Sequence, residues 1–382
     1  MLMTKKFCLY LTNAARFNQD TFEPCCWITR KGDLHNPQQL AEYRTWLSEI
    51  DDWVPECDFC LDKEKRGISS PRQKAELHPN KILGLQPNNN PNDITSLELQ
   101  IDSGCNAACI ICGDHNSSTW EKYNIGKITD KSTSNKRIDL NNKLRTKSRF
   151  EVLKKTVSLD KINMIVFLGG EPLDSDLHKE MLYEIKKVKP LSDVDVRYVT
   201  NGSKIPDEET VQLWRELKNL TIVFSLDGIG EHFNYLRWPL QWSQVEKNIK
   251  FFIDLQMTTL DIGISSAINP FNIFYYDRYI AWEKEFFKDI GFPKGVRFRN
   301  AFEATGIINT GCIPSKLSTQ IYKKYFISES WLIKHKNIFD TKLYDEFVQY
   351  IKLHDAKRGL NWKEVFPEIV EYFPNFGADG EI

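Results

Sequence analysis

Short apolar runs alternate with amphipathic stretches through the middle of the chain. Leu97, Leu99 and Ile101 alternate with polar residues as in a strand, and residues 164–170 form a continuous apolar run typical of a strand buried on both faces. The predicted strands are 95–104, 164–170, 194–202, 220–228, 260–269 and 296–300, and the predicted helices between them are 175–189, 207–219 and 243–256. This alternation predicts an α/β fold with a parallel sheet and right-handed crossovers. Because six strands are fewer than the eight of a complete barrel, we predict an open, partial (β/α)6 barrel.

The regions on either side of this alternation have different patterns. Residues 86–95, QPNNNPNDIT, are rich in Asn and Pro and are typical of a linker. The segment before the linker has no long apolar repeat and is rich in cysteine, whereas the segment after the last strand is mostly helical in pattern. We therefore predict three parts, which are a cysteine-rich module at 1–85, the barrel at 95–305 and a helical C-terminal extension at 306–382.

Composition narrows the class of protein. A chain of 382 residues with 41% hydrophobic content can bury a large core. A formal net charge of −1 gives no overall attraction to nucleic acid or to an anionic membrane, and the chain lacks a run of 18 apolar residues that would predict a membrane span. Nine cysteines would be at risk in an oxidising compartment. We therefore predict a cytoplasmic protein whose clustered cysteines serve a metal or catalysis.

Polar and glycine residues gather at the carboxyl ends of the predicted strands. The first strand ends at three cysteines, and the next three strands end at the sequences GGEP, TNG and SLDG. The carboxyl ends of parallel strands meet at one edge of the sheet, where α/β enzymes bind their ligands. The sequence therefore predicts one site that is built from these strand ends.

The cysteines fall into two groups and one isolated residue. Cys105, Cys109 and Cys112 have the spacing C-x3-C-x2-C. A structural zinc site usually has four ligands and disulfides need pairs, so three thiolates suit a metal group that keeps one position open. The second group is Cys8, Cys25, Cys26, Cys57 and Cys60, and Cys312 is isolated.

A basic segment separates the first two predicted strands. Residues 127–155 carry ten Lys or Arg against three Asp or Glu. This composition is that of either a solvated insertion or a basic patch for an acidic peptide or nucleic acid. The histidines show no metal-ligand spacing, and the chain has no GxGxxG or P-loop motif that would predict another nucleotide site.

The motifs at the strand ends resemble those of the radical S-adenosylmethionine (SAM) superfamily. The triplet Cys105, Cys109 and Cys112 is followed by GGEP, TNG and SLDG in the expected order, and the resemblance covers roughly residues 95–300. It implies that the three thiolates bind three irons of a [4Fe–4S] cluster, and that the fourth iron takes the amino and carboxylate groups of SAM. It also implies reductive cleavage of SAM to methionine and a 5′-deoxyadenosyl radical, which takes a hydrogen atom from the substrate. One departure is Ile111, where an aromatic residue often stands in this family.

The same resemblance implies a set of SAM-binding residues. They are Gly169, Gly170, Glu171, Asn201, Ser225, Asp227 and Arg237. The two glycines and Glu171 would hold the amino group of SAM, since a carboxylate suits an ammonium. Ser225 and Asp227 would face the ribose or the carboxylate, and Arg237 would meet the carboxylate. The alternatives are a surface-loop carboxylate for Glu171, a plain turn for Ser225 and Asp227, and a surface salt bridge for Arg237.

The N-terminal cysteines resemble the half-module that binds one auxiliary [4Fe–4S] cluster in radical SAM enzymes with twitch or SPASM-like extensions. The implied ligands are Cys8, one of Cys25 and Cys26, Cys57 and Cys60. By this analogy we favour Cys25, with Cys26 as a buried neighbour. In most of these enzymes the module follows the barrel, whereas here it precedes it. A structural zinc site is the alternative, because both metal groups accept four thiolates.

Cys312 lies in the sequence NTGCIPSK, beyond the last predicted strand. One interpretation is a hydrogen-atom donor that quenches a substrate radical, as some radical SAM peptide epimerases require. The others are a buried free cysteine that packs as a small hydrophobe and an extra cluster ligand.

We therefore predict a radical SAM enzyme with two [4Fe–4S] clusters and an electron donor such as a flavodoxin or ferredoxin. The substrate that we favour is a ribosomally made peptide that receives a crosslink, a thioether or an epimerisation, because auxiliary modules recur in such enzymes. A small metabolite or nucleotide is the alternative substrate. The alternative outside this family is a zinc-stabilised nucleic-acid-binding module, which would leave GGEP and SLDG without a role.

Overall fold

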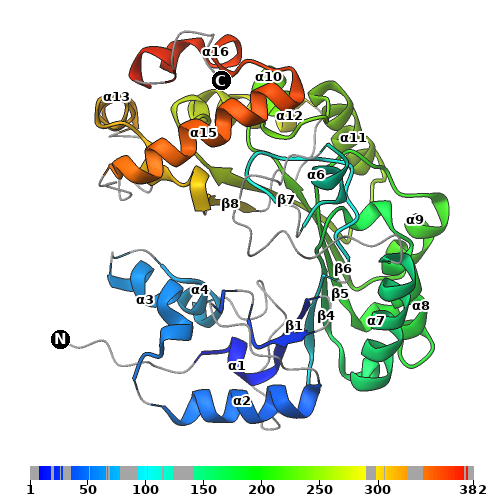
Figure 1. The fold of residues 1–382 in the computed structure, drawn as a ribbon. Coiled ribbons are helices and arrows are strands. Elements are labelled where there is room, and N and C mark those ends of the chain that lie inside the picture. The colour runs from blue at the N-terminus through cyan, green and yellow to red at the C-terminus, as the bar shows by residue number, and fades with distance from the viewer. Residues whose placement is uncertain are drawn as a thin grey trace.

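One curved sheet of eight strands organises the chain (Figure 1). The computed structural model describes residues 8–18, 21–25, 27–28, 36–50, 52–65, 67, 69–77, 93–100, 102–113, 116–123, 142–289, 298–304, 306–325, 339–373 and 376. The strand order is β2-β1-β3-β4-β5-β6-β7-β8. The bounds are Ala14–Asn18 for β1, Thr21–Glu23 for β2, Ser96–Gln100 for β3, Met164–Phe167 for β4, Asp195–Thr200 for β5, Asn219–Ser225 for β6, Leu260–Ile268 for β7 and Phe298–Glu303 for β8. All neighbouring strands are parallel except β1 and β2, which are antiparallel.

The α/β prediction is confirmed, and the six predicted strands are β3 to β8. The predicted count of six is wrong, because β1 and β2 bring two more strands from the N-terminal segment. The β1 strand pairs in parallel with β3, from Ala14 beside Ser96 to Asn18 beside Gln100. Short strands carry a weak sequence signal, and their formation depends on a partner edge, here that of β3. Backbone hydrogen bonds therefore tie the N-terminal segment to the sheet that carries the cysteine triplet.

The outer face of the sheet forms the hydrophobic core. The residues Leu97, Ile165, Val196, Leu220 and Leu260 stand side by side across β3 to β7, and each is buried. Helices cover this face (Figure 1), namely α7 at Asn142–Thr156, α8 at Leu177–Lys186, α9 at Glu208–Arg215 and α11 at Trp242–Asp254. The last three confirm the helices predicted between the strands.

The opposite face of the sheet is polar. The strand register places one row of residues across β1 and β3 to β7, which is Arg16, Glu98, Val166, Arg197, Thr221 and Asp261. Successive residues of a strand point to opposite faces, so this row faces away from the covering helices. Arg16, Glu98, Arg197 and Thr221 are only partly buried. The inner face therefore carries charged groups of both signs and a hydroxyl group, and four of the six side chains in this row are partly exposed.

The N-terminal segment forms a small unit beside the β1 edge. Its helices are α1 at Tyr10–Asn13, α2 at Pro37–Glu49, η1 at Pro55–Cys57, α3 at Asp58–Lys65 and α4 at Pro71–Leu77. A satellite apolar cluster contains Leu9, Tyr10, Ala14 and Ala75, packed against Cys8 and Cys25. Arg72 on α4 binds Glu64 on α3 through two hydrogen bonds, Nη2 to Oε2 at 2.7 Å and Nε to Oε1 at 3.1 Å. This bidentate pair is buried and fixes α4 against α3.

The C-terminal helices lie at the other end of the sheet, near β8 (Figure 1). They are η6 at Gly306–Ile308, η7 at Thr310–Cys312, α13 at Ser315–Tyr325, α15 at Thr341–Arg358, α16 at Trp362–Val365 and η8 at Pro367–Tyr372. Helix α15 begins after Asp340, whose side chain accepts a hydrogen bond from the Leu343 N–H at 3.0 Å. It ends at Gly359, whose φ of 63° is the left-handed conformation that favours glycine at a helix end.

The remaining elements connect the strands on the helical side. They are α6 at Ser118–Lys122, η2 at Leu159–Lys161, η3 at Pro172–Asp174, η4 at Leu191–Asp193, α10 at Gly230–Leu236, η5 at Ile273–Tyr275 and α12 at Tyr276–Asp289. Among the helices that the structure describes, none has the length and apolar character needed to cross a membrane. Cys26, residues 86–92 and most of the basic segment lie outside the described residues, so the hypotheses about them stay predictions.

Candidate functional site

The loop after β3 carries the cysteines of the C-x3-C-x2-C motif. Its backbone is held by the end of α10, because the Ala108 N–H donates to the Trp238 carbonyl at 2.7 Å and the Ile110 N–H donates to the Leu236 carbonyl at 2.9 Å. These bonds bracket Cys109 on both sides. The conformation of the loop therefore depends on a segment more than a hundred residues further along the chain.

The three thiols of this loop lie close enough to influence one another. Burial raises the pKa of Cys105, and the thiols of Cys109 and Cys112 raise it further. Burial also raises the pKa of Cys109, and the guanidinium of Arg237 opposes this shift. The Nη1 atom of Arg237 lies 3.9 Å from the Sγ atom of Cys109. A buried cation beside a thiol favours the thiolate, which is the form in which cysteine binds metal.

The GGEP turn after β4 packs directly on the cysteine loop. A Cβ atom on Gly170 would lie 1.8 Å from the carbonyl oxygen of Gly104, so a larger residue does not fit without movement of the backbone. The Glu171 N–H donates to the same carbonyl at 2.7 Å. Gly169 has a φ of 128°, which L-residues with a side chain rarely adopt. Both predicted glycines thus allow the close approach of two strand ends.

Glu171 is buried beneath this turn, with both carboxylate oxygens hydrogen-bonded. Its Oε1 accepts from the Thr200 hydroxyl at 2.7 Å and from the Leu173 N–H at 3.1 Å, and its Oε2 accepts from the Asn201 N–H at 2.7 Å. Burial raises the pKa of Glu171 to about 7, although the hydrogen bonds favour the charged form. The surface-loop alternative is wrong, because the residue is only 2% exposed. The carboxylate joins the end of β5 to the GGEP turn.

Asn201 connects the TNG turn to the cysteine loop. Its Nδ2 donates to Asn106 Oδ1 at 3.0 Å and lies 3.9 Å from the Sγ atom of Cys105. The Asn106 side chain in turn donates to the Ser203 hydroxyl at 2.9 Å. The ends of β3 and β5 are thus joined by side-chain amides beside the first thiol of the triplet.

The SLDG and NYLRW segments meet in a buried ion pair. The Nη2 atom of Arg237 lies 2.8 Å from Asp227 Oδ2, and both side chains are at most 8% exposed. Asp227 Oδ1 also accepts from the Ala267 N–H at 2.8 Å, which ties β6 to β7. The plain-turn and surface-salt-bridge alternatives are therefore wrong for these two residues. The buried Nε of Arg237 has no hydrogen-bond partner among the described residues, so it is a donor that suits the carboxylate of SAM.

Ser225 ends β6 on the polar face of the sheet. It is partly buried and stands beside Ser265 of β7 in the strand register. Ser225 and Thr221 are four residues apart on β6, so their side chains point to the same face of the sheet, which is the inner, polar face.

Cys312 lies in the hydrophobic core, on η7. Its side chain is fully buried, and its thiol donates to the Ile307 carbonyl at 2.9 Å. Burial raises the pKa of Cys312 to about 12. This burial favours the interpretation as a buried free cysteine, and the hydrogen-atom-donor hypothesis stays a prediction.

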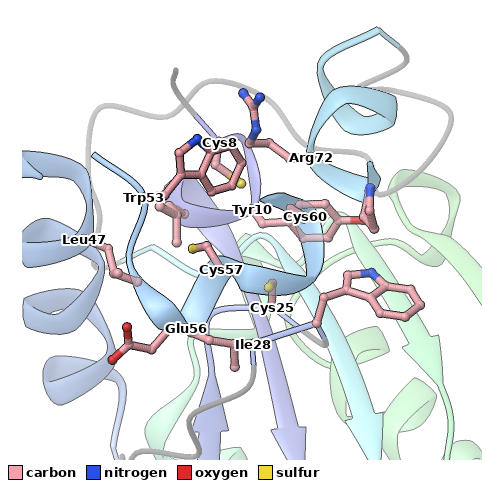
Figure 2. Close-up of a pocket in the computed structure, with 13 residues that line it drawn as sticks. Cys8, Tyr10, Cys25, Ile28, Leu47, Trp53, Glu56, Cys57, Cys60 and Arg72 are labelled. Atoms are coloured by element: carbon pink, nitrogen blue, oxygen red, sulfur yellow. The ribbon is translucent and has the colours of Figure 1, made fainter. Parts of the chain in front are cut away.

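Four N-terminal cysteines line one pocket (Figure 2). They are Cys8, Cys25, Cys57 and Cys60, and the aromatic side chains of Tyr10, Trp27 and Trp53 line the same pocket. Burial raises the pKa of Cys8 to about 12, and the thiols of Cys60 and Cys57 add to this shift. Cys26 lies outside the described residues. The fold thus gathers four thiols that are up to 52 residues apart in the sequence.

Among the described residues, we find no group of three or more His, Cys, Asp or Glu side chains that is arranged to hold a metal ion. The chemistry of the two donor sets nevertheless fits iron–sulfur clusters, because one loop offers three thiols and one pocket offers four.

Two residues of α15 contact the cysteine loop and were missed by sequence analysis. The Tyr350 hydroxyl donates to the Ile110 carbonyl at 2.7 Å, and Arg358 Nη2 donates to the Ala108 carbonyl. They are separated from the loop by 240 and 250 residues. A local motif does not reveal contacts of this range.

Comparison with known proteins identifies the domain that carries this site. Residues 99–264 match the model of the Radical SAM superfamily. The matched range includes the cysteine triplet, GGEP, TNG, SLDG and Arg237. No curated protein matches the chain.

Solved structures that match the chain include native anSMEcpe with bound AdoMet and Cp18Cys peptide, at 20% identity and a TM-score of 0.36, covering 60% of this chain and 58% of that chain. Streptococcus suis SuiB has 13% identity and a TM-score of 0.35, covering 80% and 60%. SuiB bound to the precursor peptide SuiA has 14% identity and a TM-score of 0.36, covering 84% and 58%. The chain spans about three fifths of the length of these proteins. Residues 99–264, which carry the cysteine triplet and the strand-end motifs, are thus similar to the Radical SAM superfamily.

Proposed function

We propose that this enzyme binds a [4Fe–4S] cluster through Cys105, Cys109 and Cys112 and uses SAM to modify a ribosomally made peptide. One observation carries the proposal. The three thiols lie in a single loop on which the GGEP turn packs so closely that a Cβ on Gly170 would be 1.8 Å from the loop backbone. A loop with three thiols and a neighbouring strand-end turn provides both the ligands and an adjacent surface for SAM.

The residues around the loop would bind and orient SAM. When bound, the cluster supplies the electron that cleaves SAM to methionine and a 5′-deoxyadenosyl radical. The backbone of Gly169 and Gly170 and the carboxylate of Glu171 would hold the amino group of SAM, and Glu171 also ties this turn to the end of β5. Arg237 would bind the carboxylate through its unpartnered Nε while Asp227 keeps its guanidinium in position.

Other predicted SAM contacts lie at the same edge of the sheet. Asn201 would approach SAM from beside Cys105, and Ser225 would face the ribose from the polar side of β6. The charged row on this face would hold a substrate that has hydrogen-bonding groups along its length, as a peptide does. Its partly exposed residues keep the face open to such a molecule.

We also propose that Cys8, Cys25, Cys57 and Cys60 bind an auxiliary [4Fe–4S] cluster in a twitch-like module at residues 1–85. The shared pocket of these four cysteines supports this assignment (Figure 2). The peptide substrate follows from the resemblance of this module to those of peptide-modifying radical SAM enzymes. We place the reaction in the cytoplasm, with electrons from a flavodoxin or ferredoxin, because a chain with nine cysteines suits a reducing compartment.

Metal analysis and EPR spectroscopy test the proposal. The chain would be purified and reconstituted without oxygen, and compared with a variant in which Cys105, Cys109 and Cys112 are all replaced by alanine. We expect roughly eight irons in the wild type and roughly four in the variant, with loss of a SAM-sensitive EPR signal and of 5′-deoxyadenosine formation. Four irons and one zinc in the wild type would make the N-terminal site a structural zinc site. A protein that holds only zinc would overturn the proposal.

The basic segment at residues 127–155 provides a test of the substrate class. We propose that it receives an acidic leader peptide, because it carries ten cationic residues against three anionic ones. Deletion of residues 127–150 should weaken binding of an acidic peptide and leave 5′-deoxyadenosine formation without peptide unchanged. Unchanged peptide affinity would contradict this role and would favour a small-molecule substrate.

A further inference from the structure

A second buried cation lies beside the cysteine loop. Arg358, the last residue of α15, donates from Nη2 to the Ala108 carbonyl and from Nη1 to the Tyr235 carbonyl at 3.4 Å. Its side chain lies against the ring of Trp238, with 5.6 Å between the guanidinium carbon and the ring centroid. The residue is only 7% exposed. The charge is therefore held between the loop and the end of α10.

Arg358 differs from Arg237 in how its positive charge is balanced. Arg237 is paired with Asp227 at 2.8 Å, so its charge is balanced within the protein. Arg358 contacts carbonyls and a ring but forms no ion pair within the described residues, and its Nε has no hydrogen-bond partner there. Burial of an unpaired charge is costly unless an opposite charge lies nearby. The Asp355 carboxylate on the same helix favours the charged form of Arg358 without forming an ion pair with it, and a cluster bound by three thiolates in the adjacent loop would supply a further opposite charge.

The guanidinium of Arg358 lies close to one of the three proposed cluster ligands, Cys109. Arg358 binds the carbonyl of Ala108, the residue immediately before Cys109. The guanidinium of Arg358 also opposes the rise in the pKa of Cys109, as Arg237 does. Both buried cations thus act on the same thiol, and among the described residues Arg237 forms an ion pair with a carboxylate whereas Arg358 does not.

Helix α15 also holds the loop without using charge. The Tyr350 hydroxyl binds the Ile110 carbonyl at 2.7 Å, two residues beyond the carbonyl bound by Arg358. Asp355, on the same helix, accepts a hydrogen bond from the Tyr235 hydroxyl at 2.8 Å, which ties α15 to α10. The loop is therefore held between α10, which binds its N–H groups, and α15, which binds its carbonyls.

We propose that Arg358 is a positioning residue whose buried positive charge raises the midpoint potential of the cluster held by Cys105, Cys109 and Cys112. This inference rests on the proposed function. Reduction adds one electron from the external donor and makes the cluster more negative by one charge. A fixed cation stabilises the more negative state, so its removal makes reduction harder. Arg358 itself gains and loses no electron or proton.

An anaerobic redox titration of the reconstituted full chain tests the inference, with the SAM-sensitive EPR signal as its readout. In R358Q the cation is lost, and we expect the equilibrium constant for reduction of the cluster to fall tenfold. For a one-electron reduction this corresponds to a midpoint potential that is about 59 mV lower. R358K keeps the charge and should have the wild-type midpoint. R278Q is the matched control, because Arg278 is exposed on α12 and paired with Glu368. An unchanged midpoint in R358Q, or a fall in R358K as large as in R358Q, would overturn the inference.

Y350F separates charge from loop position, since it removes one hydrogen bond and no charge. We expect faster amide hydrogen exchange at Ala108 and Ile110 in Y350F and an unchanged midpoint. A midpoint shift in Y350F as large as in R358Q would show that loop position sets the potential, which contradicts the role of the charge. Should R358Q fail to fold, the wild-type midpoint required of R358K still tests the inference. A wild type without any SAM-sensitive signal would overturn the proposed function, and this inference with it.

Discussion

Replacement of Gly170 by alanine tests the contact that joins the GGEP turn to the cysteine loop. The added Cβ would lie 1.8 Å from the carbonyl oxygen of Gly104 and 2.8 Å from the carbonyl carbon of Ser103. Both are backbone atoms, so rotation of a side chain does not relieve the clash. The two segments must separate by roughly 1.5 Å or more to reach ordinary contact. Overpacking of this kind lowers the free energy of unfolding by about 1–3 kcal/mol.

The displaced backbone leads directly into Cys105, so metal binding should respond as well. We expect G170A to lose the iron of the SAM-sensitive cluster, roughly four irons per chain, together with its EPR signal. Denaturant unfolding followed by circular dichroism would measure the change in stability. Iron analysis and EPR with and without SAM would measure the site.

The matched control is G104A, on the opposite side of the same contact. A Cβ at Gly104 would meet Asp102 Oδ1 at 3.4 Å, which is ordinary contact with a side chain that can move. G104A should therefore keep its iron and lose little stability. The reasoning is refuted if G170A keeps the iron, the SAM-sensitive signal and a wild-type free energy of unfolding, or if G104A shows the same losses.

Joint replacement of Cys57 and Cys60 by alanine should remove roughly four irons and keep the SAM-sensitive EPR signal, and loss of that signal would contradict two separate sites. Glu171 has a folded-state pKa raised to about 7 by burial, so the folded state binds its proton more tightly than the unfolded state does. The free energy of unfolding of the iron-free chain should then fall by up to about 3 kcal/mol as the pH rises from about 4.5 through 7. Denaturant unfolding at pH 5 and pH 8 measures this, and an equal pH dependence in E171Q would contradict it. C312A should form 5′-deoxyadenosine at the wild-type rate and lose about 1 kcal/mol of stability from lost packing. Loss of substrate turnover alone, at wild-type stability, would instead support Cys312 as a hydrogen-atom donor.

Local pattern predicted most of the sheet. The alternation of apolar runs with amphipathic stretches placed β3 to β8 and three of the covering helices, because strand and helix periodicity are properties of neighbouring residues. The β1 and β2 strands were missed, because segments of five and three residues carry little pattern and depend on a partner edge.

The candidate site was predicted in part. The spacing of Cys105, Cys109 and Cys112 and the position of GGEP at a strand end were legible in the sequence. Sequence reasoning placed Arg237 near SAM but did not predict its ion pair with Asp227. The sequence left open whether Cys312 is a buried free cysteine, and only the structure shows that its side chain is fully buried.

The sequence by itself determined the order of β3 to β8 and of three covering helices, the three thiols at a strand end and the class of cofactor that they suit, because each depends on residues that are close in the chain. Only the tertiary structure decided which groups surround those thiols. Arg358 reaches the cysteine loop across 250 residues, and Cys8 shares a pocket with Cys60. Such contacts depend on how whole helices pack, and that packing is the sum of many weak interactions spread over the chain.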